Sequence, residues 1–297
     1  MANKHITVLD GGTGRELRRI GAPFKQPEWS ALALLEGPEF VSRVHEAYIN
    51  AGADVITTNS YAVVPFHIGI ERFTARGAEL AALAGRLARG AADAAARKVK
   101  VAGSLPPICG SYRAEWFEPD FARPILETLV NALRPSVDLW LAETLSSTEE
   151  AILVREVVGK DGVPLWLSFT LKDDASAVER GPELRSGQSV REAVNMAVQL
   201  GAEALLFNCS QPEVMGAALK EASANLRGLK LGVYANAFAL PMGDAQANEQ
   251  LHDIRADLTP DLYFKWIQGW LAGGADIVGG CCGIGPEHIR AIRSSLA

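Results

Sequence analysis

The chain has 297 residues, a length that suits one α/β barrel of about 250 residues with insertions. Hydrophobic residues make up 48% of it, and the charged share of 22% is close to the soluble average, which excludes a disordered chain. The net charge of −6 argues against a nucleic-acid partner, and no stretch approaches the roughly 20 apolar residues of a membrane span. Because residues 1–5 lead into a strand-like run without an apolar signal segment, we expect one cytoplasmic domain over 1–297.

Apolar runs rich in β-branched residues recur along the chain, and most are followed by a segment with helical spacing. Near-continuous apolar strands that alternate with helices are typical of a parallel sheet covered by helices. Eight such units predict a closed (β/α)8 barrel, the TIM-barrel fold. The expected strands lie at residues 6–9, 55–58, 99–103, 139–142, 165–169, 204–208, 231–234 and 275–278.

Glycine and proline mark where helices are expected to end and begin. A Gly-Ala-acidic pattern recurs at 51–54, 200–203 and 273–276, each time just before an expected strand. Glycine suits the left-handed position that follows a helix. Pro260 and Pro286 are expected at helix starts, since proline fits the first helical turn.

The stretch Gly279-Gly280-Cys281-Cys282-Gly283 follows the last expected strand. Neighbouring residues on a strand point to opposite faces, so both sulfurs reach one ion only where the backbone turns, as glycine permits. Cys209 follows the apolar run 204–208 and supplies a third thiol at a strand's carboxyl end. Three thiolates with an open fourth position are typical of a catalytic zinc. The sequence therefore predicts that Cys209, Cys281 and Cys282 bind Zn²⁺ and take part in catalysis.

Two other interpretations of these cysteines remain open. The three can be unrelated buried thiols, since free cysteine often packs as a small hydrophobe. Alternatively, Cys281 and Cys282 form a strained vicinal disulfide, which would suit a redox sensor or a zinc-storing barrel without catalysis. The chain contains only four cysteines, too few for a disulfide framework at this length.

Polar residues follow the other expected strands, and in a barrel such residues share one mouth. Asp10, Gly11 and Gly12 follow the first strand, Thr58 ends the second, and Glu143 follows the fourth. The glycine N–H groups can bind a carboxylate, while Asp10 offers its charge to an amine. A buried carboxylate such as Glu143 is costly unless it has a partner or a ligand. A tight turn at the glycines and an arginine partner for the glutamate are the alternatives.

A zinc ion held by three thiolates suits a fourth thiol better than a carbonyl group. Coordination deprotonates that thiol, and a thiolate is a strong nucleophile toward carbon. None of the five histidines lies at the carboxyl end of an expected strand, so the metal is expected to activate the nucleophile. The glycines and the two carboxylates would hold an amino acid whose side chain ends in the thiol. Homocysteine fits this description.

These residues resemble the homocysteine S-methyltransferase family over essentially the whole chain. The resemblance implies a (β/α)8 barrel, zinc bound by the three cysteines, and homocysteine as the acceptor that becomes methionine. It also implies that Asp10 and Glu143 bind the ammonium group, with Gly11, Gly12 and Thr58 near the carboxylate. The motifs are, in order, Asp10-Gly11-Gly12, Trp29-Ser30, Ala51-Gly52-Ala53-Asp54, Thr58-Asn59-Ser60-Tyr61, Gly103-Ser104, Glu143-Thr144, Ser168-Phe169-Thr170, Asn208-Cys209 and Gly279-Gly280-Cys281-Cys282-Gly283.

The methyl donor divides this family. Cobalamin-dependent members have further domains and betaine-using members a longer C-terminus, so we expect a sulfonium donor, S-methylmethionine or S-adenosylmethionine. Such members usually read Tyr-Pro-Asn and then Gly-Glu after the seventh strand, whereas residues 234–238 read Tyr-Ala-Asn-Ala-Phe. Betaine or another donor therefore remains an alternative. The expected partners are homocysteine and this donor, with no nucleic acid and no membrane.

A cationic donor suits aromatic faces, and the polar insertion 172–188 is expected to close over it. The aromatic residues expected around the mouth are Trp29, Tyr61, Tyr112, Trp116 and Phe238.

Overall fold

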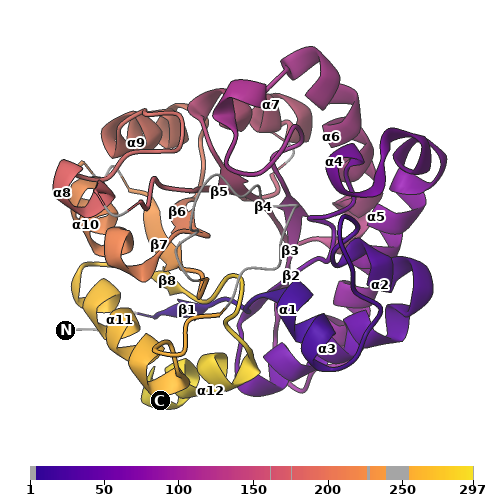
Figure 1. Ribbon diagram of the computed structural model, residues 1–297, viewed down its shortest axis with the longest axis horizontal. Helices are drawn as coiled ribbons and strands as arrows, with labels where there is room; N and C mark the ends of the chain where they lie inside the picture. Colours follow the sequence, from indigo (N-terminus) through magenta and orange to yellow (C-terminus); the bar gives the residue numbers. More distant parts are fainter. Residues whose placement is uncertain (1–4, 161, 175, 226–227, 239–253, 297) are drawn as a thin grey trace.

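A computed structural model describes residues 5–160, 162–174, 176–225, 228–238 and 254–296. Within these ranges, eight parallel strands form one sheet in the order β1-β8-β7-β6-β5-β4-β3-β2. A parallel bridge between Leu9 and Val55 joins the two edge strands and closes the sheet. The strands form a central ring with the helices around it (Figure 1). The predicted (β/α)8 barrel is confirmed.

Each strand falls on an apolar run that the sequence predicted, but two strands continue further than expected. β3 extends past Gly103 and β4 past Ala142, so Ser104 and Glu143 lie within strands rather than after them. The bounds are β1 Thr7–Val8, β2 Val55–Thr57, β3 Lys100–Leu105, β4 Leu139–Leu145, β5 Leu165–Phe169, β6 Ala204–Asn208, β7 Lys230–Tyr234 and β8 Ile277–Val278.

An irregularity in β4 explains how a residue inside a strand serves the mouth of the barrel. The register between β4 and β5 shifts between Ala142 and Leu145, and Thr144 has a left-handed φ of 62°. Such bulges bend a strand and redirect a side chain, and they are frequent beside active sites. The expectation that Glu143 follows the fourth strand was wrong, because the strand resumes pairing after this bulge.

The helices pack around the sheet, and the predicted helix starts at Pro260 and Pro286 are confirmed. Gly52 follows α3 with a φ of 108°, as its pattern predicted. No helix of the described residues combines the length and the apolar character needed to cross a membrane. The bounds are α1 Thr13–Arg19, α2 Ala31–Glu36, α3 Pro38–Ala51, α4 Pro65–Ile68, α5 Ile70–Asp93, η1 Ala114–Trp116, α6 Pro119–Leu133, η2 Arg134–Ser136, α7 Thr148–Val158, α8 Ala177–Arg180, α9 Val190–Gln199, α10 Pro212–Ala224, α11 Pro260–Ala272 and α12 Pro286–Leu296.

Strand residues divide between two apolar clusters because successive side chains alternate across the sheet. Trp140 and Ala142 belong to the large cluster between sheet and helices, whereas Leu139 and Leu141 belong to a smaller one inside the barrel. Cys281 packs against the inner cluster. The barrel interior is therefore filled, and the metal-binding candidates lie on top of it. The inner cluster consists of Leu9, Val55, Ala102, Leu139, Leu141, Trp166, Ala204, Leu206, Tyr234 and Ile277.

Candidate metal centre and substrate cavity

A cavity of about 720 Å³ lies at the carboxyl ends of the strands. This volume falls in the range of small-molecule sites. Its wall includes every residue that the sequence assigned to the site and all five aromatic residues expected at the mouth. Tertiary structure therefore brings together the predicted set of Asp10, Gly11, Gly12, Thr58, Glu143, Cys209, Cys281 and Cys282.

The three cysteines form one cluster, with their sulfurs all within 4.8 Å of one another. The Sγ atoms of Cys209 and Cys282 are 4.0 Å apart. All four cysteines of the chain are free thiols, so the structure contains no vicinal disulfide at Cys281 and Cys282. Sulfurs bound to one tetrahedral zinc at about 2.3 Å lie about 3.8 Å from each other. The spacing of the cluster therefore fits a zinc ion.

A turn after β8 lets two adjacent cysteines reach the same point. The carbonyl of Cys281 accepts a hydrogen bond from Ile284 N at 3.1 Å, which closes a four-residue turn. Gly283 occupies its third position with a φ of 85°, the value a type II turn requires there. The predicted turn is confirmed, and glycine at 283 provides the left-handed conformation at little cost.

Backbone strain is concentrated at this cavity. Non-glycine residues with positive φ are unusual and cost of order 1–3 kcal/mol each, so they persist where the surroundings enforce them. Cys209 has a φ of 51°, directly after β6. Within the described ranges, every non-glycine residue with positive φ lines the cavity, namely Trp29, Tyr112, Thr144 and Cys209.

The electrostatics of the cluster favour a bound cation. Hydrogen bonds from the thiols of Cys281 and Cys282 and from the Tyr112 hydroxyl hold the pKa of Cys209 well below its usual value. The resulting anionic sulfur and burial raise the pKa of Cys281 and Cys282. Three thiolates therefore coexist here only if a positive charge offsets their repulsion, as a metal ion does.

Glycine is required at positions 11 and 12 because both residues pack closely against the turn at residues 281–284. A Cβ at Gly12 would lie 2.6 Å from the Cys281 carbonyl oxygen, and one at Gly11 would lie 2.2 Å from that of Ile284. The Gly12 N–H donates to the Ile284 carbonyl at 3.0 Å. This amide is thus already bonded, whereas the Gly11 N–H makes no hydrogen bond with the described residues.

Two buried carboxylates in the cavity wall have no cationic partner within the part of the chain that the structure describes. Asp10 accepts hydrogen bonds from Thr57 N at 2.7 Å and Thr57 Oγ1 at 2.9 Å. Glu143 accepts from Ser104 Oγ at 2.5 Å and from Tyr234 OH at 3.2 Å. Burial raises the pKa of Asp10 from 3.8 to about 7 and that of Glu143 from 4.5 to about 7. The arginine partner considered for Glu143 is not found among the described residues.

Thr58 lines the cavity, but its hydroxyl proton is already used. Ser60 Oγ donates to the Ser104 carbonyl at 2.8 Å, so Thr58 donates in its 2.8 Å contact with Ser60. The Thr58 hydroxyl also accepts from Ser104 N at 3.0 Å. Ser104 in turn donates to Glu143, so Thr58 helps to position the serine that holds this carboxylate. The Thr58 hydroxyl has no proton left to donate to a substrate anion.

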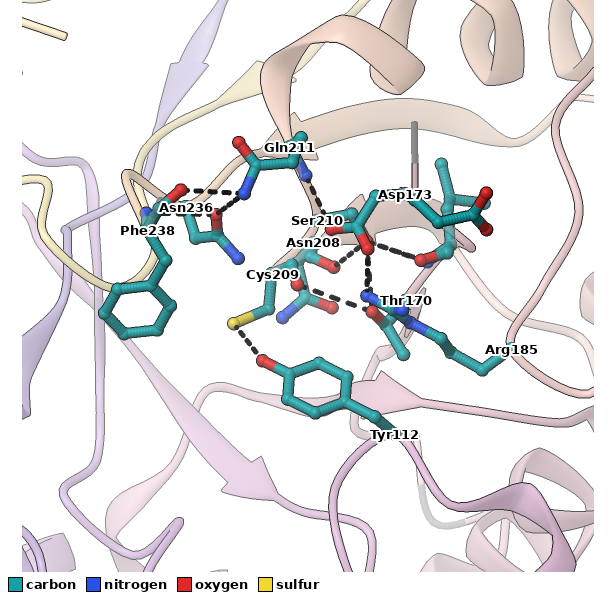
Figure 2. A network of polar contacts seen from close by, with 12 residues as sticks. Tyr112, Thr170, Asp173, Arg185, Asn208, Cys209, Ser210, Gln211, Asn236 and Phe238 are labelled. Atoms are coloured by element: carbon teal, nitrogen blue, oxygen red, sulfur yellow. Dashed lines mark hydrogen bonds and ion pairs between the residues drawn. The ribbon is translucent and has the colours of Figure 1, made fainter. Parts of the chain in front are cut away.

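A second polar network surrounds Cys209, and the sequence reasoning did not predict it (Figure 2). The Tyr112 hydroxyl lies 3.0 Å from Cys209 Sγ, and the Arg185 guanidinium lies 4.9 Å from the centre of the Tyr112 ring. The Asp173 carboxylate accepts from the Arg185 guanidinium at 2.6 Å and from the backbone N–H of Gln211 at 3.0 Å. An aspartate just beyond β5, at the carboxyl end of a strand, was the signal that could have indicated it.

The segment 172–188 contributes Asp173 and Arg185 to the cavity wall. It contains α8 and is tied down by antiparallel bridges from Leu171 to Leu184 and from Glu183 to Ser189. Its expected position beside the cavity is therefore seen, while its closure over a donor remains a prediction.

Comparison with known proteins identifies the family. A family model described as homocysteine S-methyltransferase matches residues 7–296. The chain belongs to the homocysteine S-methyltransferase family. A homocysteine S-methyltransferase of Escherichia coli (strain K12) is 31% identical over 97% of this chain and 94% of its own length. Homocysteine S-methyltransferase 1 of Brassica oleracea var. italica is 29% identical over 97% of this chain and 93% of its own.

Solved structures of this homocysteine S-methyltransferase family share the fold. The crystal structure of the E. coli homocysteine methyltransferase MmuM in its metallated form matches with a TM-score of 0.78 and 29% identity, covering 98% of this chain and 96% of that one. A metal is therefore bound by that relative. The cysteine cluster of the present family member is the group of described residues suited to such an ion.

Proposed function

We propose that this protein is a zinc-dependent methyltransferase that transfers a methyl group from a sulfonium donor to the thiol of homocysteine, forming methionine. The observation that supports it most directly is that one cavity contains both a cluster of thiols and two buried carboxylates. Three cysteine sulfurs lie within 4.8 Å of one another, and two buried carboxylates without a cationic partner among the described residues line the same wall. Membership of the family favours homocysteine as the acceptor.

The metal-binding end of the cavity provides activation of the acceptor thiol. Cys209, Cys281 and Cys282 would bind zinc, which when bound supplies the positive charge that keeps a fourth, substrate thiol deprotonated at neutral pH. The Tyr112 hydroxyl fixes the position of Cys209 Sγ through its 3.0 Å contact. Outer hydrogen bonds of this kind orient metal ligands.

The two carboxylates provide the binding site for the amino group. Their raised pKa values show that burial disfavours the charged forms, and a substrate ammonium would restore ionisation through opposite charge. Thr57, Ser104 and Tyr234 hold the two carboxylates in place by hydrogen bonds. We assign the substrate carboxylate to the Gly11 amide, with Gly12 and Thr58 shaping the adjacent wall.

The transfer step requires no general base at the sulfur once the thiol proton has left to solvent. The thiolate sulfur attacks the donor methyl carbon, the bond from that carbon to the donor sulfur breaks, and its electron pair stays on the donor as a neutral thioether. Because the sulfonium charge is lost in the transition state, the aromatic faces of Trp29 and Tyr61 suit it better than a close carboxylate.

The cavity favours catalysis over zinc storage or redox sensing. A storage or sensor protein would require the cysteines, but it would have no use for a cavity of about 720 Å³ whose wall includes Asp10 and Glu143, two buried carboxylates without a cationic partner among the described residues. Buried charges without partners are costly, and such costs are typical of functional sites.

The test is a methyl-transfer assay of zinc-loaded protein with homocysteine and, separately, S-methylmethionine, S-adenosylmethionine, betaine and methyltetrahydrofolate, with methionine measured by mass spectrometry. We expect methionine from a sulfonium donor, and loss of both activity and zinc in Cys209→Ser. Cys109→Ser is the matched control, because Cys109 is a free thiol outside the cavity wall. Zinc binding without methionine from any sulfonium would contradict the proposal.

A further inference from the structure

Guanidinium groups already lie against three of the aromatic rings that line the cavity. Each of these arginines lines the cavity itself. A guanidinium above an aromatic face occupies the position that a cationic ligand would otherwise take. The pairs, with the distance from arginine Cζ to the ring centre, are Arg113 on Trp116 at 4.2 Å, Arg185 on Tyr112 at 4.9 Å and Arg15 on Phe238 at 5.3 Å.

The two carboxylates assigned to the amine are more deeply buried than Arg113 and Arg185 in the same cavity wall. Asp10 and Glu143 are only 4% and 9% exposed, whereas the side chains of Arg185 and Arg113 are 23% and 40% exposed. The proposed acceptor has its thiol at the cysteines and its amine at the two carboxylates, so it occupies the inner end. A methyl donor must then approach from the outer end, on the side of the more exposed Arg113 and Arg185.

Arg113 and Arg185 have donors that the described residues do not fully pair. Asp173 bonds one terminal nitrogen of Arg185, while Arg185 Nε is buried and finds no hydrogen-bond acceptor among the described residues. Figure 2 shows the guanidinium between Asp173 and the Tyr112 ring. Arg113 pairs with Glu115, a glutamate that is 62% exposed, and such surface pairs are weak. An oxygen anion from a ligand would satisfy donors that the protein leaves incompletely paired.

We propose that Arg113 and Arg185 form a carboxylate-binding subsite for the methyl donor; this rests on the proposed function. Guanidinium is planar and binds carboxylates through two parallel hydrogen bonds, which sets orientation as well as charge. The subsite assigns the donor to sulfonium compounds that also bear a carboxylate, such as S-methylmethionine. Simple trialkylsulfonium ions would meet the arginine charges without compensation. The sulfonium itself would lie nearer Trp29 and Tyr61, for which no guanidinium contact is found among the described residues.

The test is equilibrium binding to the zinc-loaded protein, which does not depend on turnover. The ligands are S-methyl-L-methionine and its carboxyl methyl ester. A charge-assisted hydrogen bond corresponds to a factor of about ten to a hundred in affinity, so the wild type should prefer the acid by that factor. Arg113→Ala and Arg185→Lys should each lower this acid-to-ester ratio severalfold, with homocysteine affinity unchanged within about twofold. Arg76→Ala, an exposed arginine paired with Glu79 on α5, is the matched control and should keep the ratio.

Equal affinity of the wild type for acid and ester would overturn the subsite. So would an unchanged ratio in both cavity variants, or a loss of homocysteine affinity in their place. Arg113→Ala removes a partly exposed side chain, so this variant should fold normally. If the Arg185→Lys protein does not fold, the Arg113→Ala result alone decides the test. If the ratio responds as expected while no donor yields methionine, the subsite stands and the proposed function fails.

Discussion

Replacing Gly12 by alanine tests whether the loop after β1 sets the geometry of the cysteine pair. The added Cβ would lie 2.6 Å from the Cys281 carbonyl oxygen and 2.9 Å from Cys282 Cα. Both neighbours are backbone atoms that hydrogen bonds hold in place. Cys281 N donates to the Ala235 carbonyl at 2.9 Å, and the Cys282 carbonyl accepts from Ala237 N at 2.8 Å. The methyl group is therefore accommodated only if one of the two loops moves.

The size of that movement follows from the contacts. Relieving a 2.6 Å approach to an ordinary 3.4 Å contact takes 3.4 − 2.6, or about 0.8 Å. Metal sites tolerate ligand displacements of about 0.2 Å. We therefore expect zinc affinity to fall by about ten to a hundredfold, as when the support of a ligand is removed. Overpacking should also lower the free energy of unfolding of the zinc-free protein by about 1–3 kcal/mol.

Zinc affinity is measured by competition with a chelator, and stability by thermal unfolding with and without zinc. The matched control is Gly90→Ala in α5, where an added Cβ meets nothing within 4 Å. That change should leave zinc affinity alone and stabilise the helix by about 0.5–1 kcal/mol. A Gly12→Ala protein with wild-type zinc affinity and unchanged stability would refute the reasoning.

Three further predictions concern the carboxylates and the donor. Affinity for L-homoserine, an acceptor analogue without a thiol, should rise about tenfold between pH 6 and pH 8, because Asp10 and Glu143 lose their protons near pH 7. This pH dependence should be weaker in Glu143→Gln. A wild-type affinity that does not change with pH would argue against the amine site. Burial raises the pKa of Asp10 from 3.8 to about 7, so the folded state binds its proton more tightly and stability falls as pH rises between these values. Relative to Asp10→Asn, the unfolding free energy of the wild type should fall by up to about 4 kcal/mol over that window, and parallel pH profiles from chemical denaturation would contradict it. Tyr61→Leu should raise the donor KM about two- to thirtyfold with little change in the homocysteine KM. Tyr61→Phe keeps the aromatic ring and should keep the donor KM. Equal donor KM values for the two variants would show that Tyr61 is not part of the donor site.

The barrel and the cysteine cluster were predictable from the sequence because both depend on local patterns. Buried parallel strands must be apolar along their length, so each strand can be recognised from its own residues without knowledge of the strands beside it. Gly283 similarly permits the turn that brings Cys281 and Cys282 to one point, whatever surrounds it. Once the strands close into a barrel, their carboxyl ends share one mouth, and Cys209 necessarily joins the pair.

The hydrogen-bond partners and the charge layout of the cavity were decided only by the tertiary structure. The bulge that places Glu143 depends on the register of β4 against β5. The Gly12 amide is bonded because the loop at Ile284 lies against it, although the two are far apart in the chain. Arg185 reaches Tyr112 across two different loops. Local periodicity sets which residues face a core, but which donor meets which acceptor depends on how distant loops pack, and single-chain patterns contain no such distances.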